Sequence, residues 1–189
     1  MKWFLLCTLI LPFIVAKPKP TVVIETSMGD ITVELEPEKA PVTTKNFTRY
    51  VDAGHYKNGR VHRTVTMDNQ PDKKVKIEVI QGGVGDSFAK KDFPAIKLER
   101  TNKTGLKHLD GTISMARDGA DTATSDFFIC IGDQPALDFG GKRNPDGQGF
   151  AAFGRVVKGM DVVRKIQGQP AKEQTLTPPI KILNIRRVR

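Results

Sequence analysis

The side chain in this sequence that is best suited to catalysis is an arginine between two β-branched residues. In a strand, the side chains of Val61, Arg63 and Val65 would point to one face. A guanidinium stays protonated without tuning, and it can hydrogen-bond and polarise a group whose charge changes during a reaction. On this segment alone, an arginine at a strand end with its head in water is the more common situation.

The residues that usually bind metals or act as paired acids are too scattered to form a site. His55, His62 and His108 lie far apart and have no cysteine or carboxylate at metal-ligand spacing, so no metal site is expected. Glu34 and Glu36 alternate with apolar residues, as on the solvated face of a sheet. A hydrolytic carboxylate pair is therefore the weaker interpretation of these two residues.

Motifs for covalent or phosphate chemistry are also missing from the sequence. It contains no G-x-S-x-G elbow and no G-x-x-x-x-G-K-[ST] loop. The glycines of Gly82–Gly85 follow a strand pattern without opening a helix, which predicts a tight turn. Cys130 lies in the apolar run Phe127–Ile131, where a buried structural thiol is expected rather than a nucleophile.

The N-terminus has the pattern of an export signal. A lysine at the second position precedes the apolar run Trp3–Val15 and the small residue Ala16. This run is shorter than the roughly 20 apolar residues that span a bilayer. We therefore expect residues 1–16 to be a signal peptide and residues 17–20 an extended linker. Residues 21–189 would form one domain of an exported protein, periplasmic or secreted, without stable membrane insertion after cleavage.

The charge of the chain is positive but dispersed. The 189 residues carry a formal net charge of +9. Cleavage after residue 16 would remove Lys2 and Cys7, leaving 29 − 21 = +8 and a single cysteine, so no internal disulfide is expected. Because the basic residues are scattered and no nucleic-acid motif is present, we expect a solvated basic surface, no nucleic-acid partner and a monomer.

Period-two alternation and turn residues predict a domain of many short strands. Two helices are expected, over Ala40–Ala53, with Pro41 at its start, and over Gly159–Gln167. Most connections lack the apolar periodicity that crossover helices of a parallel sheet require. We therefore predict a mostly β fold, a closed antiparallel β-barrel of about eight strands capped by two α-helices. The expected strands are Thr21–Thr26, Ile31–Leu35, Val61–Val65, Val75–Ile80, Ile96–Leu98, Thr112–Ala116, Phe127–Ile131, Ala151–Val157 and Ile180–Val188.

Four segments, in order along residues 21–189, resemble motifs of the cyclophilin family of peptidyl-prolyl cis-trans isomerases. Each is weak alone, but together and in the family's order they make chance agreement implausible. The chain is thus similar to a bacterial-like, exported cyclophilin, which implies a cyclophilin-like barrel. The matching segments are Val61-His62-Arg63, Ile80-Gln81-Gly82-Gly83, Gly111–Ala116 with Ser125–Ile129, and Phe153–Val163.

The resemblance implies an enzyme that rotates Xaa-Pro bonds of unfolded or partly folded polypeptides. Rotation about a peptide bond has a barrier of about 18–20 kcal/mol because the amide is conjugated, and no bond between heavy atoms breaks. Catalysis can therefore come from electrostatic stabilisation of the twisted amide. Arg63 is the expected catalytic residue, and neither a metal nor another cofactor is implied.

A proline ring also needs an apolar seat beside the arginine. The resemblance assigns this seat to the apolar members of the set below, while Gln81 and the backbone near Arg117 would hold the flanking peptide. Each apolar member alone fits a core position as well as a pocket position, so only their joint placement favours a pocket. The implied substrate-binding residues are His62, Val79, Gln81, Ala116, Arg117, Asp126, Phe128 and Leu137.

The sequence departs from the family pattern at five places. The segment Thr64–Lys76 is longer than the family's usual link and would cover the groove or add contacts. Counting along the chain places Glu78 where the family commonly has a pocket phenylalanine. Arg117 replaces a common asparagine, Asp126 a glutamine, and Ala136 a large aromatic residue.

Asp126 raises a specific hypothesis about activity. It would share a strand face with Phe128 and lie within reach of Arg63, where a bidentate pair would compete with the substrate amide. An acidic groove would also favour peptides with Lys or Arg beside the proline. In the opposing interpretation Asp126 lies exposed at the rim and contributes little. These departures leave one alternative function open, a weakly active or inactive proline-peptide-binding or chaperone-like module.

Overall fold

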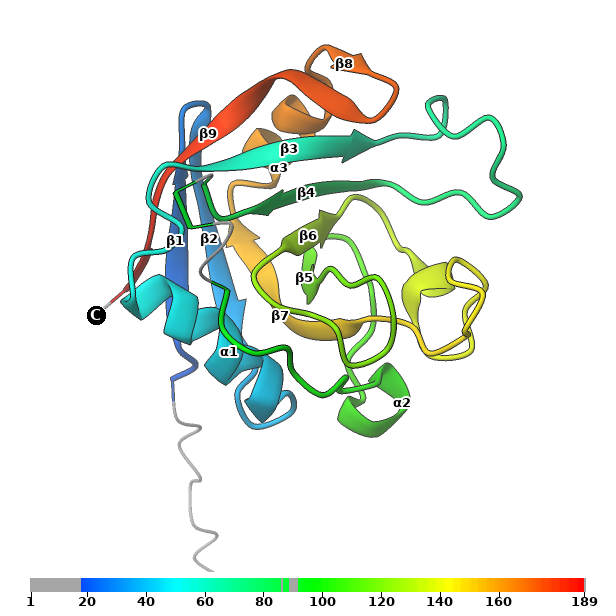
Figure 1. Cartoon of the computed structure of the whole chain (residues 1–189), viewed down its shortest axis with the longest axis horizontal. Coiled ribbons are helices and arrows are strands. Elements are labelled where there is room, and N and C mark those ends of the chain that lie inside the picture. Colours follow the sequence, from blue (N-terminus) through cyan, green and yellow to red (C-terminus); the bar gives the residue numbers. More distant parts are fainter. Residues whose placement is uncertain (1–17, 86, 89–91, 189) are drawn as a thin grey trace, which may run out of the picture.

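Eight antiparallel strands close on themselves to form a barrel in the structure, a computed structural model that describes residues 18–85, 87–88 and 92–188 (Figure 1). Around the barrel the strands follow the order β1-β2-β7-β5-β6-β4-β3-β9, and β9 pairs back with β1. A short additional strand, β8 (Ala171–Lys172), forms a hairpin with β9. The barrel strands are β1 (Thr21–Thr26), β2 (Gly29–Leu35), β3 (Gly59–Val65), β4 (Val79–Gly83), β5 (Thr112–Met115), β6 (Phe127–Cys130), β7 (Ala151–Lys158) and β9 (Thr175–Arg187).

The predicted signal peptide, residues 1–16, lies outside the described residues. The predicted closed antiparallel barrel is confirmed, and so are the two predicted helices. Helix α1 (Pro41–Asp52) and helix α3 (Met160–Gln167) both contribute side chains to the core inside the barrel. No helix among the described residues is long and apolar enough to cross a bilayer.

The start of α1 shows how a distant residue completes a local signal. Pro41 occupies the first helical turn, where its missing N–H is not needed, but the N-cap residue Ala40 offers no side-chain acceptor. Glu99 accepts hydrogen bonds from the backbone N–H groups of Val42 and Thr43, at 3.1 Å and 2.8 Å. The carboxylate thus satisfies the free donors of the helix and fixes α1 against the loop that precedes α2 (Thr101–Thr104).

Two apolar clusters lie on opposite faces of the sheet. The larger fills the barrel and includes Phe47 of α1, Phe127 of β6 and Phe153 of β7. The smaller lies outside the barrel, on β3, β4 and β6 beside the short helix η1 (Pro135–Leu137). Its buried members are Val65, Ile77, Val79, Phe128, Cys130 and Leu137.

The structure corrects two strand predictions. The strand expected over Val75–Ile80 begins only at Val79, because side chains bind the backbone of Val75 and Ile77 where a neighbouring strand was expected. Gln70 hydrogen-bonds both the N–H and the C=O of Ile77. The strand expected over Ile96–Leu98 is reduced to one bridge between Ile96 and Ala123, since the N–H of Leu98 donates to the Asp121 carboxylate.

One further boundary and one further helix differ from the prediction. Strand β9 begins at Thr175 rather than Ile180 and runs through two consecutive prolines, which the sequence pattern did not indicate as strand. A third α-helix, the four-residue α2, was missed because Thr-Asn-Lys-Thr has no apolar periodicity.

Candidate active site

A groove of about 880 Å³ runs over the outer face of β3, β4 and β6. The long segment before β4 and the loop 139–150 also contribute to its lining. All nine residues that the resemblance implied for the site line this groove, namely His62, Arg63, Val79, Gln81, Ala116, Arg117, Asp126, Phe128 and Leu137. They come from five separate stretches of the chain, so the barrel topology is what brings them together.

A β-bulge in β3 directs Arg63 into the groove. The register between β3 and β4 shifts between Val61, which pairs with Gly82, and Arg63, which pairs with Gln81. The extra residue breaks the alternation, so Val61 joins the core inside the barrel while Val65 joins the outer cluster. The prediction that Val61, Arg63 and Val65 share one face was therefore wrong for Val61.

Three hydrogen bonds to neutral oxygens hold the Arg63 guanidinium. Its Nε and Nη2 donate to Gln174 Oε1 at 3.0 Å and 2.6 Å, and its Nη1 donates to Gln81 Oε1 at 3.0 Å. Of the five guanidinium N–H groups, these bonds use three and leave two. Burial lowers the pKa of Arg63, but an arginine remains protonated in proteins. Arg63 is therefore a cation held in a fixed position, with two N–H groups that can still donate hydrogen bonds.

The apolar seat is formed by the outer cluster. Phe128 is 5% exposed, and its ring packs edge-on against Phe150 with centroids 5.3 Å apart. Val79 and Leu137 border the same part of the groove, with Ile77 beside them. These apolar residues lie together and line the groove, which is the placement that a proline pocket requires.

A buried polar relay supports the Phe128 ring from behind. The imidazole of His108 stacks against this ring with centroids 5.9 Å apart. Its Nδ1 lies 2.8 Å from Asp138 Oδ1, and its Nε2 lies 3.0 Å from Ser114 Oγ. Although the three residues have the types of a hydrolase triad, Ser114 is 0% exposed, so the relay positions the seat and cannot reach a substrate.

Asp126 contacts Gln81 and His62 rather than the predicted partner Arg63. Its Oδ2 accepts a hydrogen bond from Gln81 Nε2 at 3.2 Å and lies 3.5 Å from His62 Nε2. Burial raises the pKa of Asp126, while His62 and Gln81 act in the opposite direction. The bidentate pair expected between Asp126 and Arg63 is not formed, because Gln81 lies between the two and bonds to both.

Glu78 also departs from its predicted place. The residues on either side of it, Ile77 and Val79, line the groove, whereas Glu78 does not. Its carboxylate instead accepts a hydrogen bond from Gln167 Nε2 at 3.2 Å, at the end of α3. The alternation of the approaching chain turns this side chain to the opposite side, so the groove loses no apolar wall to a charge here.

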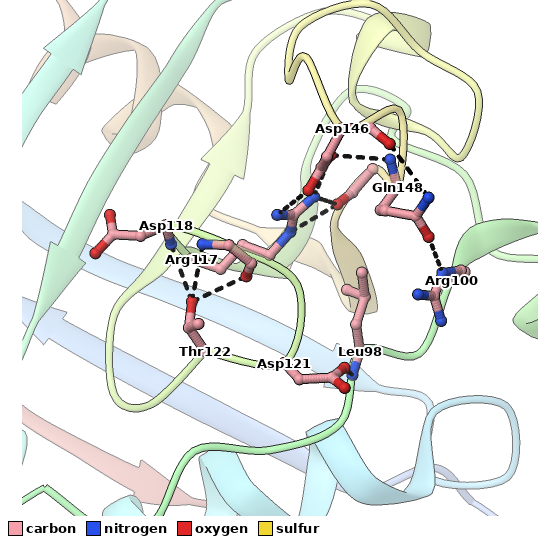
Figure 2. A network of polar contacts seen from close by, with 10 residues as sticks. Leu98, Arg100, Arg117, Asp118, Asp121, Thr122, Asp146 and Gln148 are labelled. Carbon is pink, nitrogen blue, oxygen red and sulfur yellow. Dashed lines mark hydrogen bonds and ion pairs between the residues drawn. The ribbon is translucent and has the colours of Figure 1, made fainter.

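The Arg117 side chain fixes a loop, a role distinct from the peptide contact expected of its backbone. It donates to both carboxylate oxygens of Asp146, at 2.8 Å and 3.0 Å, and to the carbonyl of Gly149 (Figure 2). Its guanidinium also lies 4.9 Å from the centroid of Phe150. Only 1% of the side chain is exposed. Arg117 therefore anchors the loop 139–150 as one wall of the groove.

Sequence reasoning missed Arg143 and Phe150, which line the groove, and Gln174, which bonds to Arg63. Gln174 holds Arg63 across 111 positions of sequence and donates through Nε2 to the carbonyl of Asn69. No local pattern marks it, because it lies in the turn between β8 and β9. Phe150 directly precedes a predicted strand and was the only one of the three with an apolar signal.

The described residues contain no group of three or more His, Cys, Asp or Glu side chains that could hold a metal ion. Cys130 is buried and unpaired, as predicted, and burial raises the pKa of its thiol.

Comparison with known proteins agrees with this geometry. The family described as "Cyclophilin type peptidyl-prolyl cis-trans isomerase/CLD" matches residues 21–187. "Peptidyl-prolyl cis-trans isomerase A" of Dickeya dadantii is 40% identical over 158 residues, which cover 82% of this chain and 75% of that protein. "Peptidyl-prolyl cis-trans isomerase B" of Escherichia coli is 36% identical over 148 residues, covering 78% and 84%.

A solved structure supports the fold independently. The crystal structure of a cyclophilin-type isomerase from Cryptosporidium parvum superposes with a TM-score of 0.72 at 24% identity, covering 90% of this chain and 98% of that one. The barrel order of the strands and the grouped groove residues are consistent with these matches. The chain therefore belongs to the cyclophilin-type peptidyl-prolyl cis-trans isomerases.

Proposed function

We propose that the chain isomerises Xaa-Pro bonds of unfolded or partly folded polypeptides outside the cytosol, and that Arg63 supplies the main electrostatic stabilisation. The observation that carries this mechanism is the fixed guanidinium beside an apolar seat. Three of its N–H groups bind Gln174 and Gln81, and the remaining two are available to a bound peptide. A related structure, of the Cryptosporidium parvum protein, was determined in the presence of the dipeptide Ala-Pro.

The proposed reaction requires no proton transfer and no covalent intermediate. As the amide twists, its nitrogen loses conjugation and becomes pyramidal, with its lone pair free to accept a hydrogen bond. A fixed N–H donor of Arg63 stabilises that state more than the planar amide, which lowers the barrier. Phe128, Val79 and Leu137 would hold the ring while the preceding carbonyl rotates.

Replacing Arg63 with alanine tests the mechanism. We expect kcat/KM on a short Ala-Pro peptide, measured by NMR exchange, to fall about ten- to a thousandfold, the range for losing one transition-state donor. Arg164→Ala is the matched control, since Arg164 pairs with Asp110 on the surface of α3 and does not line the groove. An Arg63→Ala protein with wild-type circular dichroism and near-wild-type kcat/KM would refute the mechanism.

The alternative, a peptide-binding module with little activity, is less favoured by the geometry. It rested partly on Glu78 and on a pair between Asp126 and Arg63, and neither feature occupies the groove as expected. Calorimetry with the same Ala-Pro peptide separates the two functions. A protein that binds the peptide but does not accelerate its exchange would be the binding module.

Export and a monomeric state are part of the proposal. The charged start, the apolar run and the small residue at position 16 support cleavage near that position. Expression in a bacterial host should yield a periplasmic or secreted species whose mass has lost about 16 residues, as that pattern requires. Full-length protein confined to the cytosol would contradict export. Light scattering of the cleaved species checks the monomer, and salt-sensitive binding to DNA would contradict the absence of a nucleic-acid partner.

A further inference from the structure

A second arginine lies in the groove beside Arg63 and takes no part in the mechanism above. Arg143 belongs to the loop 139–150, and its Nη1 donates to Gln70 Oε1 and to the carbonyl of Val75, both at 2.7 Å. Both acceptors lie in the long segment before β4. Arg143 therefore bridges the two loops that border one end of the groove.

The orientation of Arg143 leaves one edge of its guanidinium available. Both N–H groups of Nη1 are used, and among the described residues no hydrogen bond is formed by Nε or Nη2. The edge formed by Nε and Nη2 is the one that matches a carboxylate in a bidentate pair. Since the other side of the group is held by two neutral oxygens, this edge is fixed in place before any ligand binds.

The charge around Arg143 is not balanced by an acid of its own loop. Asp146, the only acidic residue of the loop 139–150, is held by Arg117 through both carboxylate oxygens (Figure 2). Burial lowers the pKa of Arg143, and the nearby positive charge of Arg63 lowers it further. Lys73, from the long segment before β4, lines the same groove. This end of the groove therefore carries clustered positive charge.

The acidic side chains that line the groove do not pair with Arg143, and two of the three have other partners. Asp126 binds Gln81 and His62. Asp92 accepts hydrogen bonds from Thr124 and from the hydroxyl of Tyr50. The Asp118 carboxylate points away from the loop 139–150 in Figure 2. Among the described groove residues, none of these carboxylates forms an ion pair with Arg143.

We propose that Arg143 and Lys73 form an acceptor for an acidic side chain next to the proline of the bound polypeptide. The proposal rests on the isomerase function and adds a substrate preference to it. An aspartate or glutamate would bind the free edge of Arg143, and Lys73 would add a second, more mobile cation. The two loops thereby make the groove selective for acidic residues on one side of the proline.

The test compares peptides that differ only in charge beside the proline. Glu, Gln or Lys is placed either directly before or directly after proline, and kcat/KM is measured for each peptide by NMR exchange at low and high salt. For the wild-type protein we expect Glu to exceed Gln by about three- to thirtyfold at one of the two positions, the range for a half-buried charged hydrogen bond. Lys should be the poorest residue there, and high salt should reduce the difference.

Variants assign the preference to the proposed residues. Arg143→Gln should abolish the advantage of Glu over Gln, and Lys73→Gln, at an exposed position, should reduce it in part. Lys142→Gln is the matched control, because Lys142 is the exposed neighbour of Arg143 and does not line the groove. It should retain the full preference.

The outcomes distinguish this proposal from the proposed function. A wild-type protein inactive on all six peptides would refute the isomerase function itself. Activity on the Gln peptides with no advantage for Glu at either position would overturn only the acidic-residue acceptor. A Glu preference that survives in both Arg143→Gln and Lys73→Gln would also overturn it.

Discussion

Gln174 is expected to set the activity of Arg63 without touching the substrate, and the change Gln174→Leu tests this. The leucine keeps the approximate size of the side chain but removes the oxygen that accepts from Arg63 Nε and Nη2 at 3.0 Å and 2.6 Å. It also removes the donor to the carbonyl of Asn69. Only the bond to Gln81 would then orient the guanidinium.

The expected loss follows from these contacts. A hydrogen bond to a charged group contributes about 1.5–3 kcal/mol. Because Arg63 is only partly buried, water replaces one of the two lost bonds, and we count one. At about 1.4 kcal/mol per tenfold change in rate, kcat/KM should fall about ten- to a hundredfold. The loss should appear in kcat rather than KM, because the guanidinium acts on the twisted amide.

The assay is NMR exchange on an Ala-Pro peptide with three further variants. Gln174→Glu keeps the acceptor and should restore most of the activity. Gln169→Leu is the matched control, since the half-buried Gln169 does not line the groove and its side chain bonds only to the carbonyl of Lys165 among the described residues. In an Arg63→Ala background, Gln174→Leu should cost nothing further. An equal loss in both backgrounds, or no loss in the wild-type background, would refute the positioning role.

Three other predictions follow from the structure. Asp126→Asn keeps an acceptor for Gln81 but removes a negative charge. Any preference for peptides with Lys over Glu beside the proline, at the Asp126 end of the groove, should therefore disappear. An unchanged ratio of kcat/KM between the Lys and Glu peptides would contradict this. Cys130 is buried with a raised thiol pKa, so it should react with a thiol reagent only after denaturation, and rapid labelling of the native protein would count against the fold here. Burial raises the pKa of Asp138, but the hydrogen bonds from His108 outweigh burial and the net pKa is lowered. The stability that ionised Asp138 contributes should therefore be present above the unfolded pKa near 3.8 and be lost as the pH falls through the lower folded pKa. The difference in melting temperature between wild type and Asp138→Asn should therefore shrink below about pH 4, and a constant difference down to pH 2.5 would disprove the linkage.

The sequence alone was sufficient to predict the barrel and to name nine residues that line the groove. Alternation along short strands and the missing crossover helices indicated a closed antiparallel sheet, because these signals depend on near neighbours in the chain. Six of the nine expected site residues lie within the four motifs, the other three follow from the family resemblance around them, and all nine line the groove. Burial of Cys130 could be predicted for the same reason, since its apolar neighbours are adjacent in sequence.

Side-chain direction and long-range partners were decided only by the tertiary structure. A single bulge placed Val61 and Arg63 on different faces, and Glu78 faces α3 while its neighbours Ile77 and Val79 line the groove. Asp126 was expected to pair directly with Arg63, but the Gln81 side chain lies between them and bonds to both. Gln174 and Arg143 carry no local signal, because the contacts that define them join residues 111 and 73 positions apart. Such partners depend on register and on loop closure, which short-range periodicity does not encode.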